Sequence, residues 1–275
     1  MRSLENAVAV VTGAGSGIGR ALAAELAGRG CALALADVDA AGLEVTKKLV
    51  ESLVKTMTRT VDVSNLAEMT GLRDDVQNEF GRVSLLINNA GVGLYGRFTE
   101  VSIADFEWIM GINFWGAVYG CKLFLPMLLE EPAANIVTIS SVFGIVAPPL
   151  NSGYCASKFA VRGFSETLRH ELALSNVRVT VVHPGGINTN IARTSRVGAH
   201  ADAEKFNLDV DEFQKKLVAT PEYAAAKIVG AILRDAPRLL IGRDARILEL
   251  VQRFWPARYI AVLAPLLDPK KQFRE

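Results

Sequence analysis

Short apolar runs alternate with longer stretches of helical period along almost the whole chain. The apolar runs are rich in Val, Ile and Leu and mostly lack polar alternation, as expected of strands buried on both faces of a parallel sheet. Repeated alternation of strand and helix indicates right-handed βαβ units. The expected strands are residues 7–13, 32–37, 59–63, 85–91, 135–141, 177–185 and 238–242.

Helical periodicity fills most of the intervals between these runs. The expected helices cover residues 19–30, 66–81, 103–131, 154–174 and 224–235. No repeat, low-complexity tract or Gly/Ser linker divides the chain. We therefore expect one α/β domain, a doubly wound (Rossmann-type) parallel seven-stranded sheet with helices on both faces. This domain would span residues 1–243, followed by an apolar C-terminal helical extension over 244–275.

Composition excludes several classes of protein. The net charge of +1, from 30 basic and 29 acidic residues, gives no electrostatic reason to expect nucleic-acid binding. The three cysteines form neither a metal-ligand pattern nor an even disulfide set, and the three histidines form no cluster. No metal is therefore expected. With no signal peptide and no apolar run of about 18 residues, we expect a cytoplasmic location rather than an integral membrane protein.

The stretch VVTGAGSGIGRALA joins the first expected strand to the first helix, with glycines at positions 13, 15, 17 and 19. Glycine permits tight turns and close backbone approach, and a helix start presents free N–H groups and a positive dipole end to a pyrophosphate. A glycine-rich turn alone is weak evidence. Here it follows the first strand and precedes a second strand that ends in an acid, which is the context expected of a dinucleotide site.

That acid is Asp37, although Asp39 could share its role. A carboxylate at this position can bind the adenosine ribose hydroxyls and would repel a 2′-phosphate. The glycine loop carries Ser16 and the residue after Asp37 is Val38, so neither position has a basic side chain. We expect Arg20 to point along the first helix. NAD is therefore favoured over NADP.

Tyr154 and Lys158 stand four positions apart in YCASK. On a helix, side chains at this spacing share one face, with Cβ atoms about 5–6 Å apart. The pair could be a packed aromatic ring with a lysine lying over it. It could also be a phenol whose ionisation the ammonium group favours.

Six motifs in one order resemble the short-chain dehydrogenase/reductase family. They are TGAGSGIG (12–19), NNAG (88–91), Asn113, ISS (139–141), YCASK (154–158) and HPGGINT (183–189). The similarity covers residues 7 to about 242, and a serine precedes the tyrosine by thirteen positions. The resemblance implies an NAD(P)-dependent Rossmann-fold oxidoreductase whose catalytic residues are Asn113, Ser141, Tyr154 and Lys158.

Each implied role has a physical basis. Tyr154 would act as general acid/base, and the ammonium group of Lys158 together with the positive nicotinamide ring would bring its pKa from near 10 toward the working range. Lys158 would also hold the nicotinamide ribose. Ser141 would bind the substrate oxygen, and Asn113 would hold a water that relays protons from Lys158.

The resemblance also implies a set of cofactor contacts. The glycine loop would hold the pyrophosphate, Asp37 the adenosine ribose, and the pair after the third strand the adenine. The turn after the fourth strand would support the ribose, and the segment after HPGG would bind the nicotinamide carboxamide. The cofactor-binding residues are therefore expected to be Gly13, Ser16, Gly17, Ile18, Gly19, Asp37, Asp62, Val63, Asn89, Ala90, Gly91, Tyr154, Lys158, Ile187 and Thr189.

The substrate is expected to meet loops at the carboxyl ends of the strands, including a long connection at 190–219. The loops at 92–98 and 142–150 and the region of Ile191 are apolar and aromatic and contain no cluster of charges, whereas the rest of 190–219 carries mixed charge. They favour a hydrophobic secondary alcohol or its ketone, such as a steroid, terpenoid or lipid. The residues expected to contact it are Ser141, Phe143, Tyr154, Leu94 and Ile191.

The C-terminal extension is apolar enough to need a partner. Ile247, Leu248, Val251, Phe254 and Trp255 fall near one helical face. A protein contact, on a neighbouring subunit or over the active-site mouth, is favoured over peripheral membrane association. The family resemblance implies a homodimer or homotetramer built on the helices that carry Asn113 and Tyr154.

Three other functions compete with the NAD-dependent dehydrogenase. The first is an NADP-dependent carbonyl reductase. The second is a catalytically idle NAD(H)-binding sensor, although sensors on this fold usually lose the tyrosine or the lysine. The third is a nucleotide-sugar epimerase or dehydratase, although those chains are longer and carry a larger C-terminal substrate domain.

Overall fold

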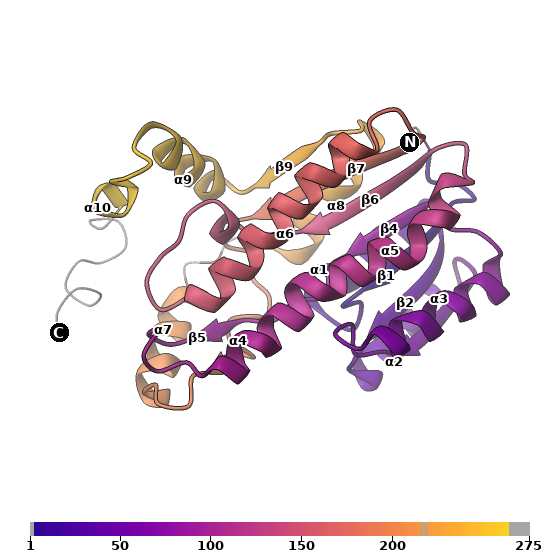
Figure 1. Ribbon diagram of the computed structural model, residues 1–275. Helices are drawn as coiled ribbons and strands as arrows, with labels where there is room; N and C mark the ends of the chain where they lie inside the picture. Colours follow the sequence, from indigo (N-terminus) through magenta and orange to yellow (C-terminus); the bar gives the residue numbers. More distant parts are fainter. Residues whose placement is uncertain (1–2, 216, 218, 264–275) are drawn as a thin grey trace.

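The computed structural model describes residues 3–215, 217 and 219–263. A seven-stranded, wholly parallel sheet forms its centre, in the strand order β3-β2-β1-β4-β6-β7-β9 (Figure 1). The prediction of a doubly wound sheet is confirmed. Its strands are β1 (Val8–Thr12), β2 (Ala32–Asp37), β3 (Thr56–Thr60), β4 (Leu85–Asn88), β6 (Ala134–Ile139), β7 (Val177–Pro184) and β9 (Arg238–Ile241).

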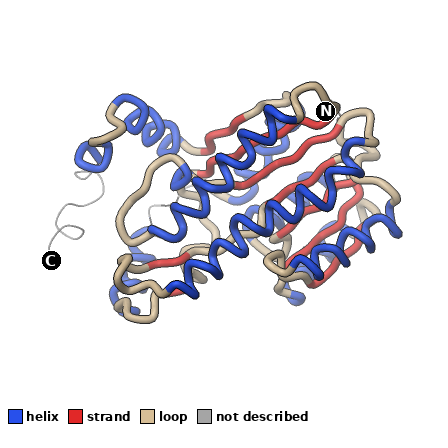
Figure 2. Tube along the Cα trace, in the orientation of Figure 1, coloured by secondary structure: helices blue, strands red, loops and turns tan. Residues whose placement is uncertain are grey.

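Helices cover both faces of the sheet (Figure 2). The first face is packed by α1 (Gly17–Ala27), α2 (Ala40–Val50) and α8 (Pro221–Leu233). The second face is packed by α3 (Leu66–Phe80), α5 (Gly116–Leu129) and α6 (Ser152–Glu171). The helix α4 (Ile103–Met110) runs into α5 through a short π-helical stretch, η1 (Gly111–Trp115). A single 3-10 turn, η2 (Val142–Gly144), follows β6.

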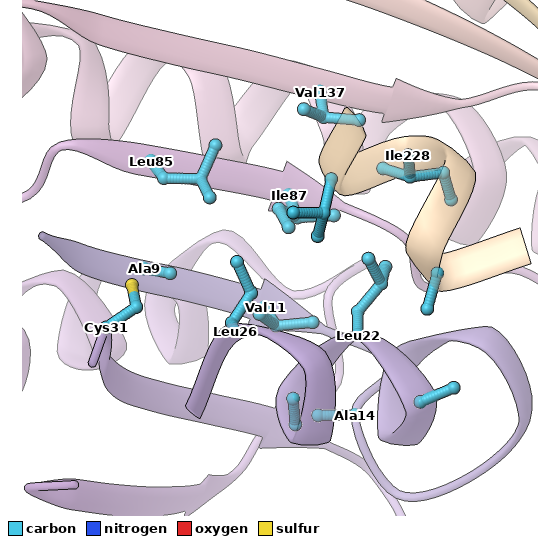
Figure 3. Close-up of a cluster of buried hydrophobic side chains, with 14 of the residues drawn as sticks. Ala9, Val11, Ala14, Leu22, Leu26, Cys31, Leu85, Ile87, Val137 and Ile228 are labelled. Atoms are coloured by element: carbon cyan, nitrogen blue, oxygen red, sulfur yellow. The ribbon is translucent and has the colours of Figure 1, made fainter. Parts of the chain in front are cut away.

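The core on the first face shows why these segments form their elements (Figure 3). Val11 and Ile87 come from adjacent strands and are fully buried. Leu22 and Leu26 lie one turn apart on α1 and face these strands, and Ile228 of α8 packs in the same cluster. Each fully buried aliphatic side chain contributes about 1.5–3 kcal/mol relative to exposure. This packing fixes α1, and therefore the loop before it, against the sheet.

Strand order reverses beside β1, which pairs with β2 on one side and β4 on the other. The connections after these strands therefore diverge, leaving a crevice at their carboxyl ends. The glycine loop follows β1, Asp37 ends β2, and Asn89 follows β4. The topology thus brings the candidate cofactor residues to one edge of the sheet.

Two predictions of individual elements were wrong or incomplete. The third strand was expected over 59–63 but runs over Thr56–Thr60. It is one of the two edge strands of the sheet, and its residues are mostly half-buried and polar, so the apolar run that predicts central strands is missing. Asp62 and Val63 therefore follow the strand. Helix α2 was not predicted.

The connection at 190–219 contains structure of its own. It holds β8 (Arg196–Val197) and α7 (Ala203–Lys215), and β8 pairs in parallel with β5 (Leu94–Tyr95). The Tyr95 hydroxyl donates a hydrogen bond to Asp209 (2.7 Å), and the Arg196 guanidinium lies 3.7 Å from the centroid of the Trp108 ring. These contacts attach the connection to the segment around β5 and α4.

The C-terminal extension is helical over its described part, with α9 (Arg243–Phe254) and α10 (Tyr259–Leu263). Only part of the expected apolar face of α9 is buried. Leu248 packs against η2, whereas Ile247, Phe254 and Trp255 are exposed. Residues 264–275 of the predicted extension lie outside the described residues.

Among the described residues, one continuous helical stretch is long and apolar enough to cross a membrane by length and composition. It is Ile103–Leu129. Its most apolar 18 residues have a mean hydropathy of 1.3, and 44% of them are buried inside the protein. The stretch is α4, η1 and α5, and α5 packs on the sheet between α3 and α6 (Figure 1). The core helix of an α/β domain passes the same test.

Candidate active site

The four predicted catalytic residues converge beyond the carboxyl ends of β4 and β6. Asn113 lies in η1, Ser141 is the N-cap of η2, and Tyr154 and Lys158 lie one turn apart on α6. Lys158 and Asn113 approach each other beside Gly91. A Cβ added there would lie 3.1 Å from Lys158 Nζ and 3.3 Å from Asn113 Oδ1.

Asn113 is almost fully buried, and its side chain is held from two sides. Its Oδ1 accepts a hydrogen bond from the Val92 amide (2.8 Å), and its Nδ2 donates to the Val92 carbonyl (3.0 Å). Nδ2 also donates to Ser157 Oγ at 2.9 Å, and Ser157 donates to the Tyr154 carbonyl. Asn113 therefore connects the segment after β4 to the helix that carries Tyr154 and Lys158.

Tyr154 shares a hydrogen bond with the Ser141 hydroxyl, and its ring lies edge-on to Phe143 with centroids 6.1 Å apart. Burial raises the pKa of Tyr154 to about 12, and the hydrogen bond with Ser141 opposes this increase only in part. The Ser141 Oγ also accepts from the Phe143 amide (3.1 Å). In this state Tyr154 is a neutral phenol.

Lys158 is 3% exposed, and burial lowers its pKa to about 8. Its Nζ donates to the Ile139 carbonyl (3.0 Å) and lies 5.7 Å from the centroid of the Tyr154 ring. In this geometry burial outweighs any effect of Lys158 on the pKa of Tyr154, and the expected joint effect of Lys158 and a positive nicotinamide ring stays a prediction. Desolvation of the phenolate is the largest effect on Tyr154, and it works in the opposite direction.

The glycine loop has the backbone shape that a pyrophosphate site requires. Gly13 and Gly17 have positive φ angles of 65° and 51°. A Cβ at Gly19 would collide with the Gly13 carbonyl oxygen, so the loop closes tightly over the start of α1. Ser16 is the N-cap with extended backbone, and Ile18 packs against the core below. The Ser16 side chain makes no capping hydrogen bond, so the N-terminal amides of α1 are available to a pyrophosphate.

Asp37 is oriented by backbone amides. One carboxylate oxygen accepts from Gly15 (2.7 Å) and the other from Asp39 (3.0 Å). Arg20 does not point along α1 as expected. Its Nε donates to Thr46 Oγ1 (3.0 Å), and its terminal nitrogen donates to the carbonyl oxygens of Gly15 and Gly42. The guanidinium thus returns to the glycine loop, where its donors bind protein groups.

The turns after β3 and β4 close the crevice. Asp62 accepts from the amide and hydroxyl of Ser64, and Val63 is buried against Gly116. Asn89 Nδ2 donates to the carbonyl oxygens of Thr12 (2.9 Å) and Gly13 (3.0 Å). The turn after β4, which includes Ala90, is therefore tied directly to the glycine loop.

The segment after β7 reaches the same loop from the opposite side. The side chain of Thr189 lies 3.3 Å from where a Cβ of Gly17 would stand, and the Thr189 amide donates to the Ile187 carbonyl. Ile187 is buried and pairs with Ala219. The glycine cradle, the oriented acid and the converging turns fit a dinucleotide along this crevice.

Comparison with known proteins agrees with this geometry. Residues 7–199 match the family model described as short chain dehydrogenase. The chain belongs to the short-chain dehydrogenase family. A crystal structure of a family member from Burkholderia phymatum in complex with NAD superposes with a TM-score of 0.86 at 32% identity, covering 93% of this chain and 96% of that one.

Two curated relatives carry the similarity over the whole length. The oxidoreductase SadH of Mycobacterium tuberculosis is 40% identical over 268 residues, which cover 96% of each chain. Estradiol 17-beta-dehydrogenase 11 of Pongo abelii is 30% identical over 273 residues, covering 98% of this chain and 86% of the relative. This short-chain dehydrogenase is an NAD(P)-dependent oxidoreductase that acts on CH–OH groups.

The predicted substrate residues of this dehydrogenase take different positions. Phe143 lies beside Tyr154, in contact with the catalytic cluster. Leu94 is 3% exposed and lies against Gly153, one residue before Tyr154. Ile191 is half-buried at the start of the connection to α7, and its carbonyl accepts from Ser195.

Two residues close to the cluster were not identified from the sequence. Ser157, fully buried in YCASK, bridges Asn113 and the Tyr154 carbonyl. His183, fully buried in β7, has Nδ1 3.0 Å from the Ser141 carbonyl oxygen. The sequence offers only a serine among small residues and a lone histidine, and neither pattern is informative without the fold.

The Cys155 thiol and the possible metal ligands are also candidate functional groups. Burial raises the pKa of the Cys155 thiol to about 12, so the cysteine beside Tyr154 is a protonated packing residue. Among the residues that the structure describes, no group of three or more His, Cys, Asp or Glu side chains could hold a metal ion.

Proposed function

We propose that the chain interconverts a hydrophobic secondary alcohol and its ketone with NAD, and that Tyr154 is the general acid/base. The observation that carries this proposal is the convergence of Tyr154, Ser141, Lys158 and Asn113 next to a crevice shaped for a dinucleotide. All four groups are present. Hydrogen bonds connect Asn113 to the Tyr154 carbonyl through Ser157 and connect Tyr154 to Ser141, and Lys158 lies over the Tyr154 ring. A sensor that only binds NAD(H) has no need of them.

The roles follow from the contacts. Bound NAD(H) would supply or accept the hydride at its nicotinamide ring. Ser141 would hold the substrate oxygen beside the Tyr154 hydroxyl and steady its developing charge. In ketone reduction Tyr154 would donate its proton to that oxygen, and its raised pKa keeps it in the required neutral form. In alcohol oxidation it must accept the proton, which needs the positive charge of Lys158 to favour the phenolate.

Asn113 is proposed to take part in a proton relay, and its surroundings support this role. Both of its side-chain N–H groups are engaged, and it lines a cavity of about 10 Å³, close to the smallest that can hold one water molecule. The same cavity is lined by Asn88 and Thr138, whose Oδ1 and Oγ1 have no other hydrogen-bond partner. A water held there would extend the polar path behind Lys158.

NAD is proposed over NADP because of Asp37. Its carboxylate is fixed by Gly15 and Asp39 at the end of β2, where it would repel a 2′-phosphate. Arg20 lies close by, but its donors are used by Thr46, Gly15 and Gly42. The NADP-dependent carbonyl reductase remains the alternative.

A bulky apolar substrate is proposed on the basis of the residues around Tyr154. Phe143 and Leu94 present apolar surface next to the catalytic cluster, and Ile191 begins the connection that borders it. The substrate that the name of the Pongo abelii relative gives, estradiol, is of the same chemical class. A steroid, terpenoid or lipid alcohol fits this description.

A homodimer or homotetramer is proposed on α5 and α6. Trp115 at the start of α5 is 47% exposed, and Phe159 on α6 is 39% exposed. The exposed side chains of α9, including Phe254 and Trp255, are proposed to meet another subunit, with peripheral membrane contact as the alternative. We retain 1–243 as the catalytic domain and 244–275 as its extension.

The test is a titration with NADH and NADPH, followed by turnover of an alcohol and ketone panel. Tyr154→Phe should abolish turnover of every substrate accepted by the wild type and leave NADH affinity nearly unchanged, because it removes only the hydroxyl. Tyr223→Phe, an exposed tyrosine on α8, is the matched control and should retain full activity. Substantial activity in Tyr154→Phe would exclude the catalytic assignment, and tighter binding of NADPH would exclude the NAD assignment.

A further inference from the structure

The segment 185–189 follows β7 and carries Ile187 and Thr189, the residues proposed to face the nicotinamide. Its first amide, that of Gly185, donates to the Ile241 carbonyl at 2.8 Å and so continues the β7–β9 ladder. The next amide, that of Gly186, leaves the ladder and donates to Asp244 Oδ2 at 2.6 Å. Asp244 is therefore the point at which the C-terminal extension contacts the cofactor crevice.

The chain makes room for this carboxylate with glycines. A Cβ at Gly185 would collide with Asp244 Oδ2, and a Cβ at Gly242 would collide with Asp244 Oδ1. Gly242 also has a φ of 104°, which side-chain-bearing residues rarely adopt. Asp244 lies in the first turn of α9, where the helix dipole stabilises its negative charge. Backbone shape and charge both favour the bond to Gly186.

The position of Gly186 matters for the crevice because the segment is short. Only Ile187 and Asn188 separate it from Thr189, whose side chain lies against Gly17 of the glycine loop. The far end is held by Gln214, which donates to the Thr189 carbonyl at 3.1 Å, and by the Asn188 amide, which donates to the Ala219 carbonyl at 2.8 Å. Asp244 holds the near end.

We propose that Asp244 is a positioning residue that holds the 185–189 segment in the conformation that binds the nicotinamide end of the cofactor. The inference rests on the proposed function, since it requires that Ile187 and Thr189 face the nicotinamide. It makes α9 part of the active site rather than an appendage of the domain. The inference concerns the nicotinamide end alone, because the contacts of Asp244 with the described part of the chain are at Gly185, Gly186 and Gly242 and not at Asp37 on the adenosine side.

The test compares two ligands, NADH and ADP-ribose, by isothermal titration calorimetry. ADP-ribose lacks only the nicotinamide. Asp244→Ala should weaken NADH binding about tenfold, as expected from the loss of one charge-assisted hydrogen bond, while ADP-ribose affinity changes less than about twofold. Asp244→Asn keeps an acceptor oxygen of the same reach without the charge and should restore most of the NADH affinity.

Asp74→Ala is the matched control. Asp74 is an exposed acid on α3 that pairs with Arg73, and its removal changes the net charge equally. It should leave both affinities at the wild-type value. Circular dichroism melting identifies a variant that does not fold. If that is the case for Asp244→Ala, the comparison is made with Asp244→Asn, for which NADH but not ADP-ribose should weaken about threefold.

The outcomes are distinct. Selective loss of NADH affinity supports the inference. An equal loss for NADH and ADP-ribose indicates a general structural role and overturns it, as does unchanged affinity for both ligands. If the wild type itself binds NADH no tighter than ADP-ribose, no nicotinamide contact exists, and the proposed function of Ile187 and Thr189 fails together with the inference.

Discussion

His183 shows how a single buried residue can affect the catalytic centre without touching substrate. Its Nδ1 lies 3.0 Å from the Ser141 carbonyl oxygen. Because a carbonyl can only accept, Nδ1 must carry the proton, and Nε2 is left buried without a partner. The pKa of His183 falls to about 4, mainly through burial and also through the nearby positive charges of Arg238 and Arg162. The imidazole is therefore neutral at every pH at which the enzyme would work.

This shift predicts a specific loss of stability in acid. Between pH 6.5 and pH 4 the unfolded chain binds a proton at His183 and the folded chain does not. The free energy of unfolding therefore decreases as the pH is lowered through this range. The contribution of this one group is about 3 kcal/mol, present above pH 6.5 and lost near pH 4. His183→Asn retains a donor for the Ser141 carbonyl and does not titrate.

Urea denaturation at several pH values measures the difference. The wild type should lose about 3 kcal/mol more than His183→Asn between pH 6.5 and pH 4. Carboxylates protonate in both proteins, so their contribution cancels in the comparison. Parallel pH curves for the two proteins would show that His183 takes up its proton in the folded state.

At the scale of elements, α10 is connected to the substrate side of the catalytic cluster. The Tyr259 hydroxyl accepts a hydrogen bond from the Ala147 amide at 3.0 Å. Tyr259 packs against the cluster that contains Val142 and Val146, which follow Ser141, and Leu248 of α9 packs against the same cluster. The extension thus covers the segment that leads away from Ser141.

Removal of that hydroxyl is predicted to affect substrate binding alone. Tyr259→Phe keeps the ring in the cluster and leaves the Ala147 amide without this acceptor. One hydrogen bond contributes about 1 kcal/mol, so KM for an apolar substrate should rise about fivefold, with kcat and NADH affinity unchanged. Steady-state kinetics of Tyr259→Phe beside the Tyr223→Phe control measure the effect. An unchanged KM would show that α10 has no part in shaping the pocket.

The elements also show which features are readable from sequence. Five strands lie in the sheet interior, and their Val, Ile and Leu runs predict them within a few residues, as the apolar run of the edge strand β9 also does. β3 differs because it is an edge strand with half-buried polar residues, and a strand of this kind resembles a loop. The β5–β8 pair is only two residues long on each side and depends on Arg196 and Tyr95 contacts across about one hundred residues.

In the candidate site, the positions of the residues could be predicted from the sequence but their pKa values could not. Its residues were predicted because a family resemblance fixed their spacing, and the structure brings Asn113, Ser141, Tyr154 and Lys158 together. Their electrostatics could not be predicted. Burial determines the direction in which the pKa of Tyr154 shifts, and burial depends on the folded surroundings rather than on the spacing to Lys158.

At the scale of the whole molecule, α5 and α6 lie side by side and cover one face of the sheet (Figure 1). Their inner sides carry the core, including Phe124 and Val161. Their outer sides expose Trp115 and Phe159. Large aromatic side chains exposed on adjacent helices are typical of a protein interface.

The last prediction concerns this outer side. Phe159→Glu introduces a charge at the centre of the proposed interface and should convert the oligomer to a smaller species, because burying an unpaired carboxylate costs several kcal/mol. Light scattering after size-exclusion chromatography measures the mass. Leu174→Glu is the control, since Leu174 follows α6 and is also exposed, and its mass should match that of the wild type. If Phe159→Glu keeps the wild-type oligomer, α6 does not form the interface, and the exposed face of α9 becomes the next surface to test.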